Sequence, residues 1–500
     1  MLYLGIDSGT QSTKAIVLDL TTGETIASAS AAYGLIPGLP QGHLEQHPQD
    51  WVTATEKTIS AVLDKIGPRR EEVRGIGVSG QQHGLVVLDR EDEVIRPAKL
   101  WCDTSTTAQC DAFAEEFGGQ KNIVRLFGNA ILPGYTAPKI LWLKENEPHH
   151  YERVATILLP HDYLNYWLTG EKCMEYGDAS GTGLLDVRTR KWSERLLEFI
   201  DPNLEEKLPP VQSSKRAAGL LREELRKKWN LPGTVIVSSG GGDNMMGAIG
   251  TGNIYPGVVT ASFGTSGTLF ACAARPVIDE RECEVAAFCD SADHWLPLVC
   301  TMNVTVATER VRELFSWDHA KLNAAVAAAK VGSDGLLFLP YLNGERTPNL
   351  PEGTGVFHGL TTRNMTPENI ARATMEGVTL GLAYGLERLA ELKVVPKEIR
   401  MIGGGSKSPV WRQMAADIFG VPVVCPINPE GAALGAAIQA AWVEGLTVGH
   451  GHTLDKLCTD AVRLDESTRC TPNPDAVAVY AELLDKQTGL TRKLNAAGYL

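Results

Sequence analysis

Residues 2–18 read LYLGIDSGTQSTKAIVL, and this stretch decides the fold. Two apolar segments, residues 2–6 and 15–18, flank a turn rich in Gly, Ser and Thr, a pattern that predicts a β-hairpin. The turn offers backbone N–H groups, hydroxyls and the Lys14 ammonium, which together can hold a phosphate. Asp7 precedes the turn and offers carboxylate oxygen, a ligand that Mg²⁺ prefers. An ordinary polar hairpin turn that binds nothing fits the same residues.

The same pattern returns about half a chain later. Residues 258–272 read VVTASFGTSGTLFAC, again a strand, a Gly/Thr/Ser turn and a strand. Self-similarity at half the chain length predicts two related domains, each offering a phosphate-binding hairpin to a shared cleft. Two short turns of this composition can also match by chance.

An acidic glycine turn lies between the two hairpins. Residues 234–244 read TVIVSSGGGDN, in which a β-branched run predicts a strand, and a helical stretch follows over residues 245–252. An acidic side chain on a glycine turn at a strand's end can reach into a cleft, which makes Asp243 a candidate catalytic group. The simpler interpretation is a strand-to-helix turn in which Asp243 caps the helix.

Two polar clusters upstream are candidates for binding a polyol. Residues 79–84 read SGQQHG after a predicted strand, and residues 101–105 read WCDTS. Polar side chains at a strand's end are well placed to hydrogen-bond hydroxyls. Trp101 can stack on the C–H face of a sugar, and Asp103 can hold its hydroxyls. A satisfied buried histidine at position 83 and a simple core tryptophan remain the alternatives.

A third glycine-rich segment follows a predicted strand at residues 399–402. Residues 403–408 read GGGSKS, and Ser408 is expected to cap a helix over 409–419 that Gly420 ends. Such a loop lets the backbone approach a nucleotide at a helix N-terminus, although the spacing of a P-loop is absent. A small-residue helix over 430–437 is expected to line the nucleotide pocket. A last helix is expected over 474–488, with Gly489 ending it.

Composition limits the possible partners. The chain has 500 residues, enough for two or three domains, and 47 basic against 60 acidic residues give a net charge of −13. This charge argues against nucleic acid or an anionic membrane as a partner, and an anionic ligand such as ATP must be met locally. No apolar run approaches the ~18 residues of a membrane span. The ten cysteines include no C-x-x-C pair, which favours a reducing, cytoplasmic location over a disulfide or metal framework.

These motifs, taken in chain order, resemble those of the FGGY carbohydrate kinases, and within that family the xylulose kinase branch. The similarity covers about residues 1–445, and its longest signature is the segment at residues 403–422, GGGSKSPVWRQMAADIFGVP. The resemblance implies an α/β fold of two actin-like (ribonuclease H-like) domains around a central cleft. Residues 1–252 would bind the sugar and carry the base, 253–445 would bind ATP, and 446–500 would be a C-terminal extension.

The resemblance also implies ATP-dependent, Mg²⁺-assisted phosphorylation of D-xylulose to D-xylulose 5-phosphate, with Asp243 as general base and Asp7 at the metal. The residues expected to contact the sugar are Gln82, His83, Trp101, Asp103 and Asn244. Those expected to hold the nucleotide are Thr10, Thr13, Lys14, Gly264, Thr265, Gly404, Gly405 and Ser408.

Two departures from the family pattern leave the sugar open. Many bacterial xylulose kinases carry Met where this chain has Gln82, and Arg soon after the Trp-x-Asp motif, where this chain has Thr and Ser. Ribulose, or another ketose or polyol, therefore remains an alternative substrate. An actin-like ATPase with a non-catalytic binding role is a second alternative, because it shares both hairpins but needs no sugar pocket. A homodimer is an assembly that the sequence leaves open.

Overall fold

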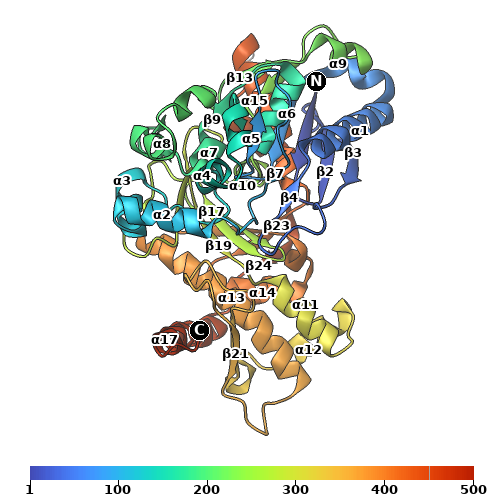
Figure 1. Cartoon of the computed structure of the whole chain (residues 1–500). Coiled ribbons are helices and arrows are strands. Elements are labelled where there is room, and N and C mark those ends of the chain that lie inside the picture. Colours follow the sequence, from blue (N-terminus) through green and yellow to red (C-terminus); the bar gives the residue numbers. More distant parts are fainter. Residues whose placement is uncertain (450) are drawn as a thin grey trace.

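A computed structural model describes residues 1–449 and 451–500 of the chain. It has two α/β halves, one above the other in Figure 1, where blue to green marks the first half and yellow to red most of the second. Each half is built on a seven-stranded mixed sheet.

The first sheet follows from the N-terminal hairpin. β1 (Leu2–Ser8) pairs antiparallel with β2 (Ser12–Asp19) and parallel with β5 (Val73–Gly80), so the hairpin and the next strand lie side by side. The remaining strands are β3 (Glu24–Ala32) beside β2, β14 (Ile236–Ser238) beside β5, β13 (Ala217–Leu220) beside β14, and the short β15 (Gly241–Gly242) beside β5.

The second sheet repeats this arrangement. β16 (Val258–Phe263) pairs antiparallel with β17 (Gly267–Ala271) and parallel with β22 (Glu398–Ile402), as β1 pairs with β2 and β5. The others are β19 (Trp295–Thr301) beside β17, β18 (Ala286–Cys289) beside β19, β23 (Val423–Pro426) beside β22, and β24 (Leu464–Cys470) beside β23. The same directions in the same order confirm the expectation of two related α/β halves.

Helices cover these sheets. In the first half they are α1 (Pro48–Ile66), α2 (Thr107–Phe117), α3 (Gln120–Phe127), α4 (Thr136–Asn146), α5 (Pro148–Arg153), α6 (Pro160–Thr169), α7 (Tyr176–Ala179), α8 (Glu194–Ile200), α9 (Glu223–Lys228) and α10 (Asp243–Gly250). In the second half they are α11 (Thr305–Leu314), α12 (His319–Ala328), α13 (Pro367–Glu391), α14 (Pro409–Phe419), α15 (Gly431–Val448), α16 (Leu454–Ala461) and α17 (Pro474–Ala496). The described helices include none that is long and apolar enough to cross a membrane.

Short paired strands complete the fold. They are β4 (Glu45–Gln46) with β7 (Ala98–Lys99), β6 (Val86–Leu88) with β8 (Thr156–Leu158), β9 (Met174–Glu175) with β12 (Val211–Gln212), β10 (Leu185–Asp186) with β11 (Lys191–Trp192), and β20 (Leu337–Pro340) with β21 (Gly355–His358).

Helix α15 joins the two halves. It comes from the second half of the sequence but packs on β1, β5 and α10 of the first, where its label lies in Figure 1. Glycines permit this approach: a Cβ on Gly5 would lie 1.8 Å from the Ala433 carbonyl oxygen, and one on Gly435 would lie 1.8 Å from that of Met246. The small-residue face of this helix, expected to line the nucleotide pocket, instead packs on the first sheet.

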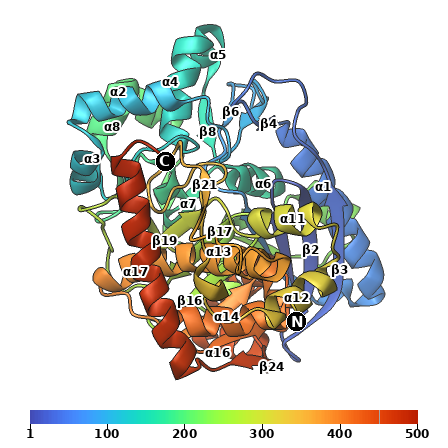
Figure 2. The same cartoon turned by 90° about the horizontal axis from the view of Figure 1, so that it is seen from below.

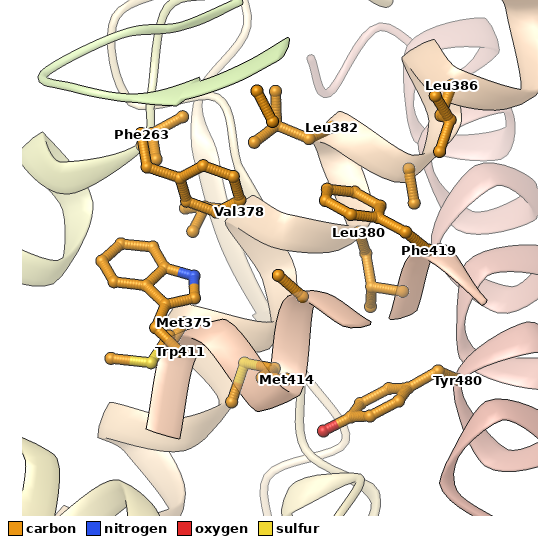
Figure 3. Close-up of a cluster of buried hydrophobic side chains, with 14 of the residues drawn as sticks. Phe263, Met375, Val378, Leu380, Leu382, Leu386, Trp411, Met414, Phe419 and Tyr480 are labelled. Carbon is orange, nitrogen blue, oxygen red and sulfur yellow. The ribbon is translucent and has the colours of Figure 1, made fainter. Parts of the chain in front are cut away.

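The core of the second half lies between its sheet and helices α13, α14 and α17 (Figure 3). Phe263 from β16 packs edge-on against Trp411 of α14, with ring centroids 5.4 Å apart. The Trp411 indole N–H is satisfied by the Thr379 hydroxyl at 2.8 Å, so a large apolar group is buried without a lost hydrogen bond.

Two elements of the last fifty residues, β24 and α17, contribute to this core, whereas α16 packs against α15. β24 extends the second sheet, and α17 runs along the outside of the second half in Figure 2. The expectation that Gly489 ends α17 is wrong, because the helix continues to Ala496. Gln487 donates to the Phe338 carbonyl at 3.0 Å, and the Thr491 hydroxyl lies 2.9 Å from that of Tyr341, so tertiary contacts carry the helix through the glycine.

Candidate active site

The glycine turn and the SGQQHG segment meet at the end of the first sheet. β15 pairs with the end of β5, which places Gly241 opposite Ser79 and Gly242 opposite Gly80. Asp243 then begins α10, and Gln82 and His83 follow β5 directly. The carboxyl ends of neighbouring parallel strands thus bring the predicted base and the predicted sugar ligands together, as is usual for sites in α/β sheets.

These residues line a cavity of about 260 Å³ between the two halves. The first half contributes Gln82, His83, Trp101, Tyr135, Asp243 and Asn244 among others, and the second half contributes Ser262, Ser266, Thr268, Glu284, Phe288, Cys300 and Arg346. Five of the six residues predicted for base and sugar therefore share one cavity with the second hairpin.

The Asp243 carboxylate is held from one side. Its Oδ1 accepts from the Asn244 backbone N–H at 2.8 Å and from Asn244 Nδ2 at 3.0 Å. Burial in the cleft raises the pKa of Asp243 to about 7, and the neighbouring carboxylate of Asp7 adds to the increase. A carboxylate with a pKa near neutrality is suited to accept a proton at physiological pH.

Asp7 lies at the end of β1, beside the Asp243 turn. It accepts from the Ser79 hydroxyl at 2.9 Å, and burial raises its pKa to about 6. Among the residues that the structure describes, none forms an ion pair with Asp7. A buried carboxylate without an ion pair, close to the carboxylate of Asp243, offers the hard oxygen donors that fit a divalent cation such as Mg²⁺.

His83 is held as a neutral ring. Its Nδ1 lies 2.7 Å from the Gly181 carbonyl oxygen, and burial together with the Lys139 ammonium lowers the pKa of His83 to about 3. A carbonyl can only accept, so Nδ1 carries the proton and Nε2 is left as an acceptor. Such a ring can accept a hydrogen bond from a hydroxyl in the cavity.

Trp101 lies in the cavity, but Asp103 does not line it. The Trp101 indole donates to the Thr10 hydroxyl at 2.9 Å, which ties the cavity wall to the first hairpin. Asp103 is fully buried and accepts from Lys99 Nζ at 3.1 Å and the Ser105 hydroxyl at 2.6 Å. The structure therefore does not bring Asp103 to the predicted sugar site, because an internal ammonium occupies its carboxylate.

A second cavity, of about 430 Å³, lies within the second half. Gly404, Gly405 and Ser408 line it, together with Thr305, His319, Asn323, Met375 and Trp411 among others. Ser408 caps α14, as expected: its hydroxyl accepts from the Trp411 N–H at 3.2 Å and donates to Asn323 Oδ1 at 2.8 Å. The predicted nucleotide loop and a helix N-terminus thus border one space.

The remaining predicted residues lie on the two hairpins. Thr13 is buried and donates to the Ser8 hydroxyl at 3.2 Å, while Lys14 pairs with Glu430 at 2.7 Å. Gly264 and Thr265 form the turn of the second hairpin and accept backbone hydrogen bonds from the start of α11. None of these four borders either cavity among the described residues, so their predicted contact with phosphate stays a prediction.

Comparisons with known proteins identify the family. The model of the N-terminal domain of the FGGY family of carbohydrate kinases matches residues 2–250, and that of the C-terminal domain matches residues 259–444. The chain belongs to the FGGY family of carbohydrate kinases. It is an ATP-dependent carbohydrate kinase, as the sequence predicts.

Relatives within the FGGY family cover nearly the whole chain. The xylulose kinase of Haemophilus influenzae is 43% identical over 97% of this chain and 98% of its own length. A xyloylose kinase from Brucella ovis has a TM-score of 0.92 at 31% identity, covering 99% and 100% of the two chains. A gluconate kinase from Lactobacillus acidophilus has a TM-score of 0.90 at 26% identity, covering 99% and 98%. These structural matches confirm the fold of two actin-like halves.

Several cavity residues of this FGGY kinase were not predicted as ligands. Tyr135 stacks on His83 with ring centroids 4.6 Å apart, and Arg346 reaches the cavity from the loop after β20. The segments GYT at 134–136 and GERTP at 344–348 stand out in the sequence as polar loops. Local pattern could not assign them to the site, because each is brought there only by packing of distant segments.

Proposed function

We propose that the chain transfers the γ-phosphoryl group of ATP to the terminal hydroxyl of D-xylulose. The observation that carries this proposal is the shared cavity, which joins Asp243, the ring of His83 and the amides of Gln82 and Asn244. A ketopentose presents several hydroxyls and a carbonyl, which match this mixture of acceptors and amide donors. Similarity to xylulose kinases over nearly the full length supports the choice of sugar.

Asp243 is the proposed general base. One of its oxygens is held by Asn244, and the other is available to the hydroxyl of the sugar. As the hydroxyl oxygen attacks the γ-phosphorus, its proton passes to the carboxylate, the P–O bond to ADP breaks, and ADP leaves. Phosphoryl transfer depends mainly on positioning and charge stabilisation, so the base increases the rate of a reaction between groups that the cavity already holds in position.

Asp7 is the proposed metal ligand, acting directly or through water. Bound Mg²⁺ would neutralise charge on the transferred phosphoryl group. The two hairpins, with Thr10, Thr13 and Lys14 on one and Gly264 and Thr265 on the other, would surround the phosphates with N–H groups and hydroxyls. A backbone cradle of this kind suits an anion in a chain of net charge −13.

The cavity bordered by Gly404, Gly405 and Ser408 is the proposed adenosine site. Its residues offer amide and hydroxyl groups beside the largely apolar side chains of Met375 and Trp411, a mixture typical of nucleoside pockets. Separate cavities for sugar and nucleoside require the phosphates to extend between them, toward Asp243.

A substrate panel tests this function. ADP formation is measured with D-xylulose, D-ribulose, glycerol and D-gluconate, and without any sugar. Turnover with D-xylulose that exceeds the others supports the proposal, and a preference for another sugar would overturn the specificity. Equal ATP hydrolysis with and without sugar would favour an actin-like ATPase.

Gluconate belongs in the panel for a structural reason. Arg346 borders the sugar cavity, and no carboxylate among the described residues forms an ion pair with its guanidinium. A guanidinium in this position suits a ligand carboxylate as well as hydroxyls.

A further inference from the structure

A buried charged cluster lies behind the glycine turn that carries Asp243. His161 of α6 is fully buried, with Nδ1 2.7 Å from Asp178 Oδ2 and Nε2 3.0 Å from Asp162 Oδ1. Burial lowers the pKa of His161, but the two carboxylates outweigh this and raise it to about 9. The cluster is therefore an imidazolium held between two acids, and it borders the active-site cavity without being part of its wall.

Three buried atoms of this cluster make no hydrogen bond among the described residues: Asp162 Oδ1 and His161 Nε2, which lie 3.0 Å from each other, and Asp178 Oδ1. Asp178 Oδ1 is buried and accepts no hydrogen bond from any described residue, and Gln82 Nε2 is likewise buried and without an acceptor. The two side chains lie against the same glycine: a Cβ on Gly242 would be 3.1 Å from Asp178 Oδ1 and 3.0 Å from Gln82 Cδ, the carbon that carries Nε2. An unpaired buried donor and an unpaired buried acceptor are each costly, and these two are complementary.

The Gln82 amide connects this acceptor to the base. Gln82 Oε1 accepts from Asn244 Nδ2 at 3.0 Å, and the same Nδ2 donates to Asp243 Oδ1 at 3.0 Å. An amide that directs its NH₂ group to one side presents its oxygen to the other. If Gln82 Nε2 faces Asp178, then Oε1 faces Asn244, and the Asn244 NH₂ group must face Asp243.

We propose that Asp178 is a positioning residue for the catalytic base and acts through the Gln82 amide, directly or through one bridging water. It thereby holds Asp243 Oδ1 and leaves the second carboxylate oxygen free for the sugar hydroxyl. The proposal rests on Asp243 being the base, as proposed above. It assigns a role to the GDASGTG segment at 177–183, whose sequence pattern indicates a tight loop but no chemistry.

A purely structural role would leave one feature unexplained. Pairing with His161 uses only Oδ2 of Asp178, and the Asp178 backbone N–H is already held by Glu175 Oε1 at 2.5 Å. Neither contact needs Oδ1 to face Gly242. A glycine at 242 is also what permits this approach, since a side chain there would separate Asp178 from Gln82.

The decisive variant is Asp178→Asn, with Asp162→Asn as the matched control on the opposite side of His161. Three ionisable groups interact electrostatically with Asp243: Asp7 from β1, Asp178 from α7 and Cys300 from β19. Removing the charge at 178 lowers kcat by about 10- to 100-fold and moves the acidic limb of kcat/KM to lower pH. Asp162→Asn keeps kcat within about twofold and leaves the limb in place. The KM for ATP stays unchanged in both.

A double-mutant cycle tests the route through Gln82. In a Gln82→Met background, Asp178→Asn causes no further loss of kcat if the two act as a unit. Additive losses, equal effects of Asp178→Asn and Asp162→Asn, or a wild-type limb in folded Asp178→Asn would each overturn the proposal. Failure of the base itself is seen separately, as activity retained by Asp243→Asn.

A structure of the wild-type enzyme with D-xylulose bound tests the same contact without a variant, in case Asp178→Asn does not fold. The proposal requires Gln82 Nε2 about 3 Å from Asp178 Oδ1, or one water between them. A Gln82 amide turned away from Asp178, with no bridging water, would overturn it.

Discussion

The ionisation of Asp243 should govern how activity depends on pH. Burial beside Asp7 raises the pKa of this carboxyl from 3.8 to about 7. A general base must be ionised, so the active fraction falls as the pH falls through this pKa. The ionised fraction is ~9% at pH 6 and ~91% at pH 8, so kcat/KM for the sugar should rise about tenfold over that interval.

Replacing the Asp243 carboxylate by an amide tests the same assignment independently. Asp243→Asn keeps the size and the contacts with Asn244 but cannot accept the proton, so kcat should fall by ~10²–10⁴-fold. The residual activity should lose the acidic limb. Asp50→Asn is a matched control, because Asp50 is also an acid in the first turn of a helix but is exposed on α1.

The assay couples ADP release to an optical signal between pH 5.5 and 9, with limiting D-xylulose and an excess of coupling enzymes. Thermal melting and ATP binding establish that each variant is folded. A wild-type profile that is flat from pH 6 to 8 would refute the assignment of a raised pKa. An Asp243→Asn enzyme that keeps the wild-type rate and limb would remove Asp243 from the chemistry.

Three further predictions follow from contacts in the structure. Gly435→Ala should lower the free energy of unfolding by ~3 kcal/mol or more, because the new Cβ would clash with the Met246 carbonyl. Gly489→Ala on α17 should raise the free energy of unfolding by ~0.5–1 kcal/mol, because the space around this glycine is open and alanine favours a helix. Denaturant titration measures both changes. Arg346→Leu should raise the KM for the sugar about 10- to 100-fold and leave that for ATP unchanged, as steady-state kinetics would show. Asn323→Ala should weaken ATP binding, measured by calorimetry, and leave the KM for the sugar unchanged.

Local sequence patterns were sufficient to predict the elements whose formation depends on neighbouring residues. The two hairpins, and α14 between Ser408 and Gly420, lie where the sequence predicts them. Strand alternation and helix caps act over a few residues, so they can be read directly, and Gly420 ends α14 as expected, whereas Gly489 does not end α17. Repetition of the hairpin also predicted the repeated sheet.

Contacts between distant segments could not be predicted in this way. The pattern at 101–105 suggested that Asp103 faces a ligand, but Lys99, whose partner choice depends on the packed fold, pairs with it instead. Arg346 and Tyr135 border the cavity proposed for the sugar, and they come from polar loops for which the sequence predicts no ligand role. The small-residue helix at 430–437 was expected to line the nucleotide pocket, but the surface on which it packs is set by glycines far away in the sequence, such as Gly5.

This packing makes Asp243, the proposed base, part of one closely packed unit. Asp243 begins α10, and a Cβ on Gly250 at the other end of α10 would lie 1.7 Å from the Gly431 carbonyl of α15. Because α15 packs closely on both β1 and β5, Asp243, Asp7 and Gln82 share one support. Ser266 and Arg346, which complete the cavity, come instead from the second half. Movement of the halves would therefore change the distance from Asp243 to the second hairpin while leaving Asp243, Asp7 and Gln82 fixed, which is the arrangement that domain closure over two substrates requires.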